Sequence, residues 1–193
     1  YRYKPLVEKP FKIPLLFSYA LVNRYRVADL QEDRSLIRNL LEEGIDVYLI
    51  EWGDPTRKDK WLTLDDYVND FLDTCVDYLR EQHNLDAINL LGICQGGTIA
   101  TCYTALHPEK IKNLVLTVTP IDFHADMEEE RDDFGLLNVW SRNLDIDLMI
   151  DALGNVELLL EHRPPPRLGR VRRERRLHIK LLKKRPDPRP VPA

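Results

Sequence analysis

The sequence predicts an α/β domain built on a parallel β-sheet. Its 193 residues are 44% hydrophobic, which is enough to form one core of ordinary size. Four short runs are rich in Leu, Ile and Val and are nearly continuous, as strands covered on both faces of a sheet are. Helical spacing lies between these runs, and strands that alternate with helices indicate βαβ units. The predicted strands cover residues 13–20, 46–52, 87–93 and 113–119.

Two helices are expected between the first three strands. Apolar residues recur at helical spacing over 36–41, and Gly44 is placed to end that helix. The second helix should begin at a capping box, in which Asp66 follows Thr63 by three residues, and continue to Leu79. Beyond Pro120 an acidic segment and a further helical pattern predict an excursion above the sheet rather than another strand.

Charge divides the chain near residue 156. Residues 1–156 carry 16 Lys and Arg against 28 Asp and Glu, a net charge of −12. Residues 157–193 carry 12 against 4, a net charge of +8, and hold 7 of the 13 prolines. We therefore expect a core over 1–120, an acidic helical segment over 121–156 and a basic Pro- and Arg-rich tail over 157–193.

Three interpretations of the tail remain open. Clustered Arg would attract nucleic acid or another anionic surface, but the tail lacks interleaved aromatic residues, so we expect no nucleic-acid partner. A disordered, solvated tail is the second interpretation. We favour the third, out-of-frame translation, because the composition inverts at one point.

The motif most informative about chemistry follows the third predicted strand. That strand runs directly into Gly92-Ile93-Cys94-Gln95-Gly96-Gly97 and then a helical pattern over 98–106. This G-x-C-x-G-G sequence has the form of the nucleophile elbow of α/β-hydrolases, with Cys in place of Ser. Glycines on both sides would keep the strained turn unobstructed, and the last would let the helix pack closely. The alternative is a buried structural Cys in a Gly-rich turn, but both flanks favour the nucleophile.

A nucleophile elbow also predicts an oxyanion hole made of two backbone N–H groups. One should belong to Gln95, the residue after the nucleophile, where a helix N-terminus favours developing negative charge. The other should come from the loop after strand 13–20, and Val22 is the candidate.

Other segments occur in an informative order along residues 1 to about 156. They are Pro14-Leu15-Leu16, Leu21-Val22-Asn23-Arg24, Asp29-Leu30-Gln31, Tyr48-Leu49-Ile50-Glu51-Trp52-Gly53, Leu62-Thr63-Leu64-Asp65-Asp66-Tyr67 and Thr119-Pro120-Ile121-Asp122-Phe123. Together with the cysteine box, they resemble the catalytic subunit of a polyhydroxyalkanoate synthase of the two-subunit, class III type.

The resemblance implies an acyltransferase that polymerises (R)-3-hydroxyacyl-CoA and releases CoA. Cys94 would hold the acyl group as a thioester, with the N–H groups of Val22 and Gln95 at the oxyanion. Residues 1–120 would be part of an α/β-hydrolase core, and 121–156 the start of a cap. The implied partners are a second synthase subunit, further copies of the chain and the surface of a cytoplasmic polyester granule. No cofactor or metal is implied.

The resemblance further implies a general-base His oriented by an Asp, both downstream of a cap. The match stops before either, so we expect both to be missing from this chain. Without that base we expect low activity. The chain starts without Met, so we expect a truncated fragment, and a truncated sheet should leave an exposed edge. His124 is a weak substitute base in an acidic loop, whereas His83 and His107 lie near helix ends. Cys75 and Cys102 are expected in the core.

The remaining observations limit the class of protein. No apolar run approaches the roughly 18 residues that a membrane span needs. Three cysteines and no recognisable signal peptide favour a reducing, cytoplasmic compartment. Two other functions stay open: a Cys-dependent ester or lactone hydrolase of the same fold, and a non-catalytic fragment that pairs with a full-length synthase or its accessory subunit.

Overall fold

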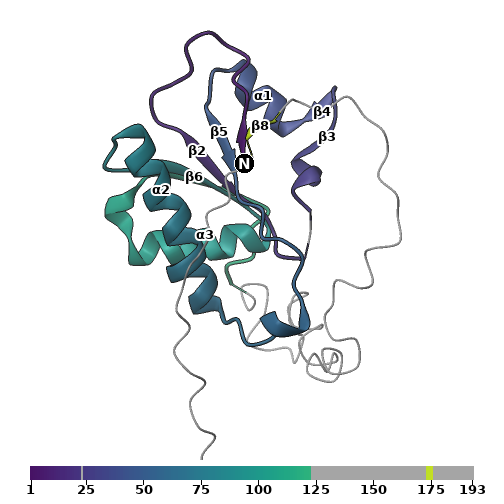
Figure 1. Ribbon diagram of the computed structural model, residues 1–193, viewed down its shortest axis with the longest axis vertical. Coiled ribbons are helices and arrows are strands. Elements are labelled where there is room, and N and C mark those ends of the chain that lie inside the picture. Colours follow the sequence, from purple (N-terminus) through teal and green to yellow (C-terminus); the bar gives the residue numbers. More distant parts are fainter. Residues whose placement is uncertain (23, 123–172, 176–193) are drawn as a thin grey trace, which may run out of the picture.

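A computed structural model describes residues 1–22, 24–122 and 173–175 (Figure 1). A six-stranded sheet has the order β7-β6-β2-β5-β1-β8, and β3 and β4 form a separate two-stranded sheet. The strands are β1 (Arg2–Tyr3), β2 (Leu15–Ser18), β3 (Asp29–Gln31), β4 (Arg34–Ser35), β5 (Val47–Leu49), β6 (Ile88–Ile93), β7 (Ile111–Thr117) and β8 (Arg173–Arg175).

Parallel pairing joins the four strands that the sequence predicts. β2 pairs with β5 on one side and with β6 on the other, and β6 also pairs with β7. β1 is antiparallel to β5, and β8 is antiparallel to β1. The four strands are confirmed, with different ends: β2, β5 and β6 are shorter than their apolar runs, and β7 begins and ends two residues before the predicted 113–119. Tyr19 and Ala20, for example, are buried in the loop after β2 rather than in the strand.

Helices cover both faces of the sheet. They are α1 (Leu36–Glu42), α2 (Asp73–His83), α3 (Gln95–Leu106) and a π-helix, η3 (Asp66–Leu72). Short 3₁₀ turns are η1 (Tyr25–Ala28), η2 (Arg57–Asp59) and η4 (Pro108–Lys110).

Capping residues explain where the helices begin and end. Ser35 caps α1 by accepting a hydrogen bond from the N–H of Arg38 at 2.9 Å, and Gly44 takes a φ of 84° just after the helix. The capping box is confirmed, since the Asp66 carboxylate accepts from the Thr63 N–H at 2.7 Å and the Thr63 hydroxyl faces the Asp66 N–H at 3.4 Å. The segment beyond it opens as the π-helix before α2 continues.

Two hydrophobic cores cover the two faces of the sheet. Side chains of η3, α2 and α3, among them Leu72, Val76 and Tyr103, form one core with Leu16 and Leu90. The other core lies between the sheet and α1. In Figure 1, α1 is near the top of the view, whereas α2 and α3 lie lower and to the left. These three layers hold the carboxyl ends of β2 and β6 next to each other.

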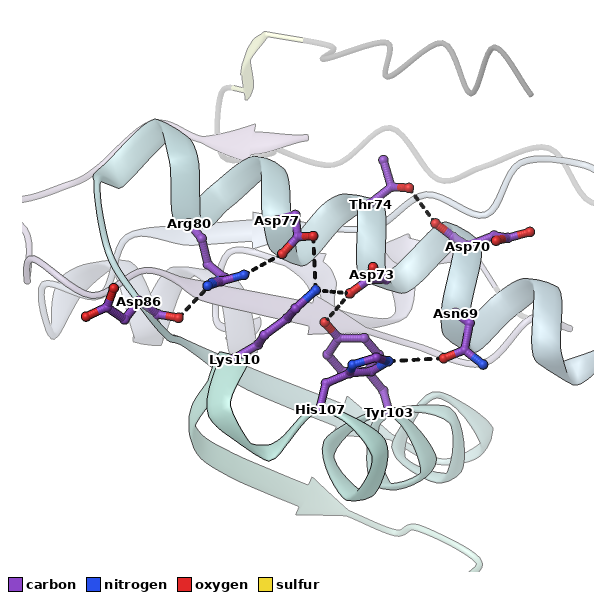
Figure 2. Close-up of polar contacts among 10 residues, drawn as sticks. All are labelled: Asn69, Asp70, Asp73, Thr74, Asp77, Arg80, Asp86, Tyr103, His107 and Lys110. Carbon is purple, nitrogen blue, oxygen red and sulfur yellow. Dashed lines mark hydrogen bonds and ion pairs between the residues drawn. The ribbon is translucent and has the colours of Figure 1, made fainter. Parts of the chain in front are cut away.

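Polar contacts fix α3 and η4 against α2 on the outer side of the first core (Figure 2). The Tyr103 hydroxyl donates to Asp73 at 2.7 Å. The Lys110 ammonium donates to Asp73 at 2.7 Å and to Asp77 at 3.0 Å. Burial raises the pKa of Tyr103, and its hydrogen bond to Asp73 adds to that shift. These contacts fix the end of α3 that lies farthest from the cysteine motif.

An apolar edge is exposed at β7. Within the described part of the chain only β6 pairs with β7, and Val115 and Leu116 are 49% and 40% exposed. Val118 and Ile121 just beyond the strand are also exposed. The expected open edge is therefore found among the described residues.

Most of the two C-terminal parts expected from the sequence lies outside the described residues. Of 121–156 the structure describes 121 and 122, and of the tail it describes the backbone of β8. His124 is outside as well. In the described residues, no helix combines the length and the apolar character that crossing a bilayer requires.

Candidate active site at the nucleophile elbow

Cys94 lies on a sharp turn between β6 and α3. Its φ of 55° and ψ of −132° are a strained combination for a residue with a side chain. Its N–H donates to the carbonyl of Thr117 on β7 at 3.0 Å, and its own carbonyl accepts from the N–H groups of Gly97 and Thr98. The neighbouring strand and the first turn of α3 thus hold the conformation in place, and the thiol is exposed.

Each glycine of the motif makes a close approach that a side chain would prevent. A Cβ on Gly92 would overlap the backbone of Gly97, and one on Gly97 would overlap the side chain of Thr119. A Cβ on Gly96 would lie 2.5 Å from the carbonyl oxygen of Ser18. The steric explanation of the motif is confirmed, with one refinement: Gly97 makes room for the segment after β7 as well as for β6.

The loop after β2 lies directly beside the elbow. The side-chain oxygen Oε1 of Gln95 accepts a hydrogen bond from the N–H of Leu21 at 3.0 Å. The indole Nε1–H of Trp52 donates to the carbonyl of Tyr19 at 2.9 Å. Val22, the next residue after Leu21, has a 56% exposed side chain. The structure therefore brings Cys94, Gln95 and the loop that carries Val22 to one edge of the sheet.

This edge is the one where such folds bind ligands. The strand order reverses between β2 and β6, because the chain passes from β5 on one side of β2 to β6 on the other. Crevices at the carboxyl ends of strands next to such a reversal are the usual ligand sites of open α/β sheets. Gln95 is also the first residue of α3, so the helix ladder does not use its N–H.

The three cysteines all lie in the described part of the chain and differ in environment. Cys94 is exposed, whereas Cys75 and Cys102 are partly buried and pack against the core formed with α2 and α3. Burial raises the pKa of the Cys75 thiol to about 11, which makes it a poor nucleophile near neutral pH. Core packing of Cys75 and Cys102 is as expected.

Neither histidine within the described residues is near Cys94. His107 follows the last turn of α3, about 20 Å along the helix axis from Cys94. Its Nε2 faces the side-chain oxygen of Asn69 at 3.1 Å. His83 contacts the Tyr48 hydroxyl at 2.9 Å and belongs to the last turn of α2, and its burial lowers its pKa. Both serve as structural contacts in this arrangement.

A polar depression of about 550 Å³ at the end of α2 is a weaker candidate site. It is lined by Asp77, Arg80, Glu81, Asn84, Leu85 and Asp86. Arg80 already donates to Asp77 and to the carbonyl of Asp86, both at 2.6 Å, as Figure 2 shows. In the described residues, His, Cys, Asp and Glu form no group suited to a metal ion.

The sequence did not predict the role of two side chains beside the elbow. The side chains of Gln95 and Trp52 support the loop after β2, although the motif suggested only the backbone N–H of Gln95. Trp52 is the last residue of the strand predicted over 46–52, and this place at the strand's carboxyl end was the available signal that it lies at the same edge of the sheet. Neither partner could be named from spacing alone.

Residues 14–147 match the alpha/beta hydrolase fold family. The chain belongs to this family. Within it, the chain is similar to proteins named poly(3-hydroxyalkanoate) polymerase subunit PhaC, which confirms the resemblance inferred from the sequence.

The chain matches only part of the length of each of these relatives. The subunit from Allochromatium vinosum is 55% identical over 144 residues, which cover 75% of this chain and 39% of the relative. The one from Thiocystis violacea is 53% identical over 157 residues, covering 81% and 42%. The one from Synechocystis is 50% identical over 158 residues, covering 81% and 41%. The chain spans about two fifths of the length of these curated relatives.

Proposed function

We propose that the chain carries the nucleophile of an acyltransferase that polymerises (R)-3-hydroxyacyl-CoA into a polyhydroxyalkanoate. The observation that supports this most is the exposed Cys94 on its strained turn at the start of α3. The similarity of the chain to proteins named poly(3-hydroxyalkanoate) polymerase subunit PhaC supports the proposed substrate class.

Thioester exchange is the first proposed step. The Sγ of Cys94 attacks the carbonyl carbon of the acyl-CoA, and the carbon–sulfur bond to CoA breaks. The proton lost by the Cys94 thiol ends on the released CoA thiol. One thioester replaces another, so the exchange is nearly balanced in free energy. The carbonyl oxygen becomes an oxyanion, which the backbone N–H groups of Gln95 and Val22 would stabilise.

Ester formation is the second proposed step. The 3-hydroxyl oxygen of another unit attacks the acyl group on Cys94, a new ester bond forms, and the thiol is regenerated. A base must take the hydroxyl proton and return it to the sulfur. The resemblance assigns that role to a His and an Asp farther along such chains, and we expect this chain alone to react slowly.

The partners belong to the same proposal. A second synthase subunit, further copies of the chain and the surface of a cytoplasmic polyester granule follow from the resemblance.

Incubation of the chain with (R)-3-hydroxybutyryl-CoA tests the function. We expect a slow covalent hydroxybutyryl adduct by intact-protein mass spectrometry, mapped to Cys94, with one CoA released for each adduct. The adduct should be lost in Cys94→Ala and kept in the control Cys102→Ala. An adduct that persists in Cys94→Ala would refute the assignment.

Product analysis separates the alternatives. Release of soluble 3-hydroxybutyrate at the rate of CoA release, with no polymer, would point to a hydrolase. No adduct, combined with stable binding to a full-length synthase, would point to a non-catalytic partner.

A further inference from the structure

We infer that the side-chain amide of Gln95 is a positioning residue for the oxyanion hole. It ties the loop after β2 to the elbow, so that the N–H groups of Val22 and Gln95 serve the same oxyanion. The inference rests on the proposed function for its chemical meaning, and on one long-range hydrogen bond for its geometry.

That hydrogen bond joins the immediate neighbours of two proposed site residues. Leu21, which donates its N–H, directly precedes Val22. Gln95, which accepts at 3.0 Å through Oε1, directly follows Cys94. The bond therefore spans 74 positions in the sequence and closes the gap between the loop and the elbow. A shift of the Leu21 peptide would move the Val22 N–H with it.

Successive contacts support the loop after β2 from its start to Leu21. At its start, the close approach of Gly96 to the carbonyl groups of Ser18 and Tyr19 holds the backbone. The Trp52 indole then holds the carbonyl of Tyr19 at 2.9 Å. Gln95 extends this support to Leu21, in a turn whose next side chain is largely exposed.

The chemistry of an amide suits this position. A glutamine oxygen accepts the Leu21 N–H without placing a formal charge beside a site where negative charge develops. Methionine has a similar length but offers only a weak sulfur acceptor, so Gln95→Met removes the tie with little change in volume. Gln95→Glu keeps an oxygen acceptor at the same reach.

Two reactions of Cys94 distinguish positioning from general damage to the elbow. Acylation by p-nitrophenyl acetate passes through an oxyanion, whereas alkylation by iodoacetamide does not. We expect Gln95→Met to slow acylation of Cys94 by about tenfold to a hundredfold and to leave alkylation within about twofold. The matched control Gln82→Met, at an exposed position of α2, should leave both rates unchanged.

Hydrogen exchange tests the tie independently of any reaction. The Leu21 amide should exchange faster in Gln95→Met than in the unaltered chain, and Gln95→Glu should restore its protection. Equal exchange at Leu21 in the unaltered chain and in Gln95→Met would overturn the inference. Equal slowing of acylation and alkylation would overturn it too, because that result would indicate a damaged elbow.

The acyl donors keep the two hypotheses apart. If Cys94 accepts an acetyl group from p-nitrophenyl acetate but never reacts with (R)-3-hydroxybutyryl-CoA, the proposed function fails while the positioning role stands. If Gln95→Met is acylated by p-nitrophenyl acetate as fast as the unaltered chain, the positioning role fails whatever the CoA ester does.

Discussion

Gly96→Ala places two opposing effects at one position in the first turn of α3. Alanine is the better helix former by about 1 kcal/mol, so propensity alone would stabilise the substituted chain. The added Cβ, however, would lie 2.5 Å from the carbonyl oxygen of Ser18 and 2.6 Å from that of Tyr19. Contacts between such atoms normally begin at about 3.5 Å. Because these are backbone atoms, no side chain can rotate away to relieve the overlap.

The overlap should outweigh the gain in helix propensity. Overpacking in a well-packed region costs about 3 kcal/mol at the upper end of its usual range. Subtracting the gain of about 1 kcal/mol leaves a net loss of about 2 kcal/mol in the free energy of unfolding. For a chain of this size that corresponds to a fall of about 4–8 °C in the melting temperature. The displaced loop should also slow acylation of Cys94.

Thermal unfolding followed by circular dichroism measures the effect, and Gly53→Ala is the matched control. Gly53 has open space around the position of a Cβ but a φ of 82°, so its substitution has only a conformational cost, of about 1 kcal/mol. Acylation of Cys94 should be unchanged in that control. A Gly96→Ala chain as stable as the original would refute the steric account of the motif.

Three further predictions concern other parts of the molecule. Asp73→Asn should cost about 1.5 kcal/mol at neutral pH. Burial opposes ionisation of Asp73, but the hydrogen bond and charge of Lys110 outweigh it and hold the pKa of Asp73 below 3.8. In urea titrations the loss of stability should therefore be constant above about pH 5 and vanish as the pH falls below 3.8. An equal loss at pH 2 would contradict this. Iodoacetamide at pH 8 should label Cys94 well before Cys75, whose pKa burial raises to about 11, and peptide mapping that finds Cys75 labelled first would count against the structure. Val118→Asn should raise the melting temperature by a few degrees, because Asn tolerates the φ of 45° at this position better than Val does. It should also reduce light scattering, because the Val118 side chain is 79% exposed. Increased aggregation would contradict this prediction.

The parallel sheet could be predicted because each inner strand carries a nearly continuous apolar run. The ends of the strands could not, since burial continues past the last ladder hydrogen bond, as at Tyr19 after β2. The capping box at Thr63 and Asp66 was visible as a local pattern. The π-helix after it was not, because apolar spacing does not distinguish a π-helix from an α-helix over seven residues.

The candidate site divides in the same way between local and long-range information. Cys94 could be found because the glycines that its turn requires stand two or three positions from it in the sequence. The hydrogen bond between Leu21 and Gln95 could not, because it depends on how β2 and β6 pair across 74 positions. A single sequence carries no signal for such a pair.

The central place of β2 has a consequence for when the chain can react during its synthesis. A nascent chain has the loop after β2 long before it has β6, and the thiol of Cys94 arrives only with the last residue before α3. Closing a loop of this length is entropically costly, and non-local pairings of this kind form slowly. Gln95 is made directly after Cys94, so its N–H is always next to the thiol, but the loop that carries Val22 reaches Cys94 only when β6 pairs with β2. On the proposed function, acyl transfer would therefore begin only once β6 has paired with β2, and a misfolded chain would carry the Cys94 thiol without the N–H group of Val22 beside it.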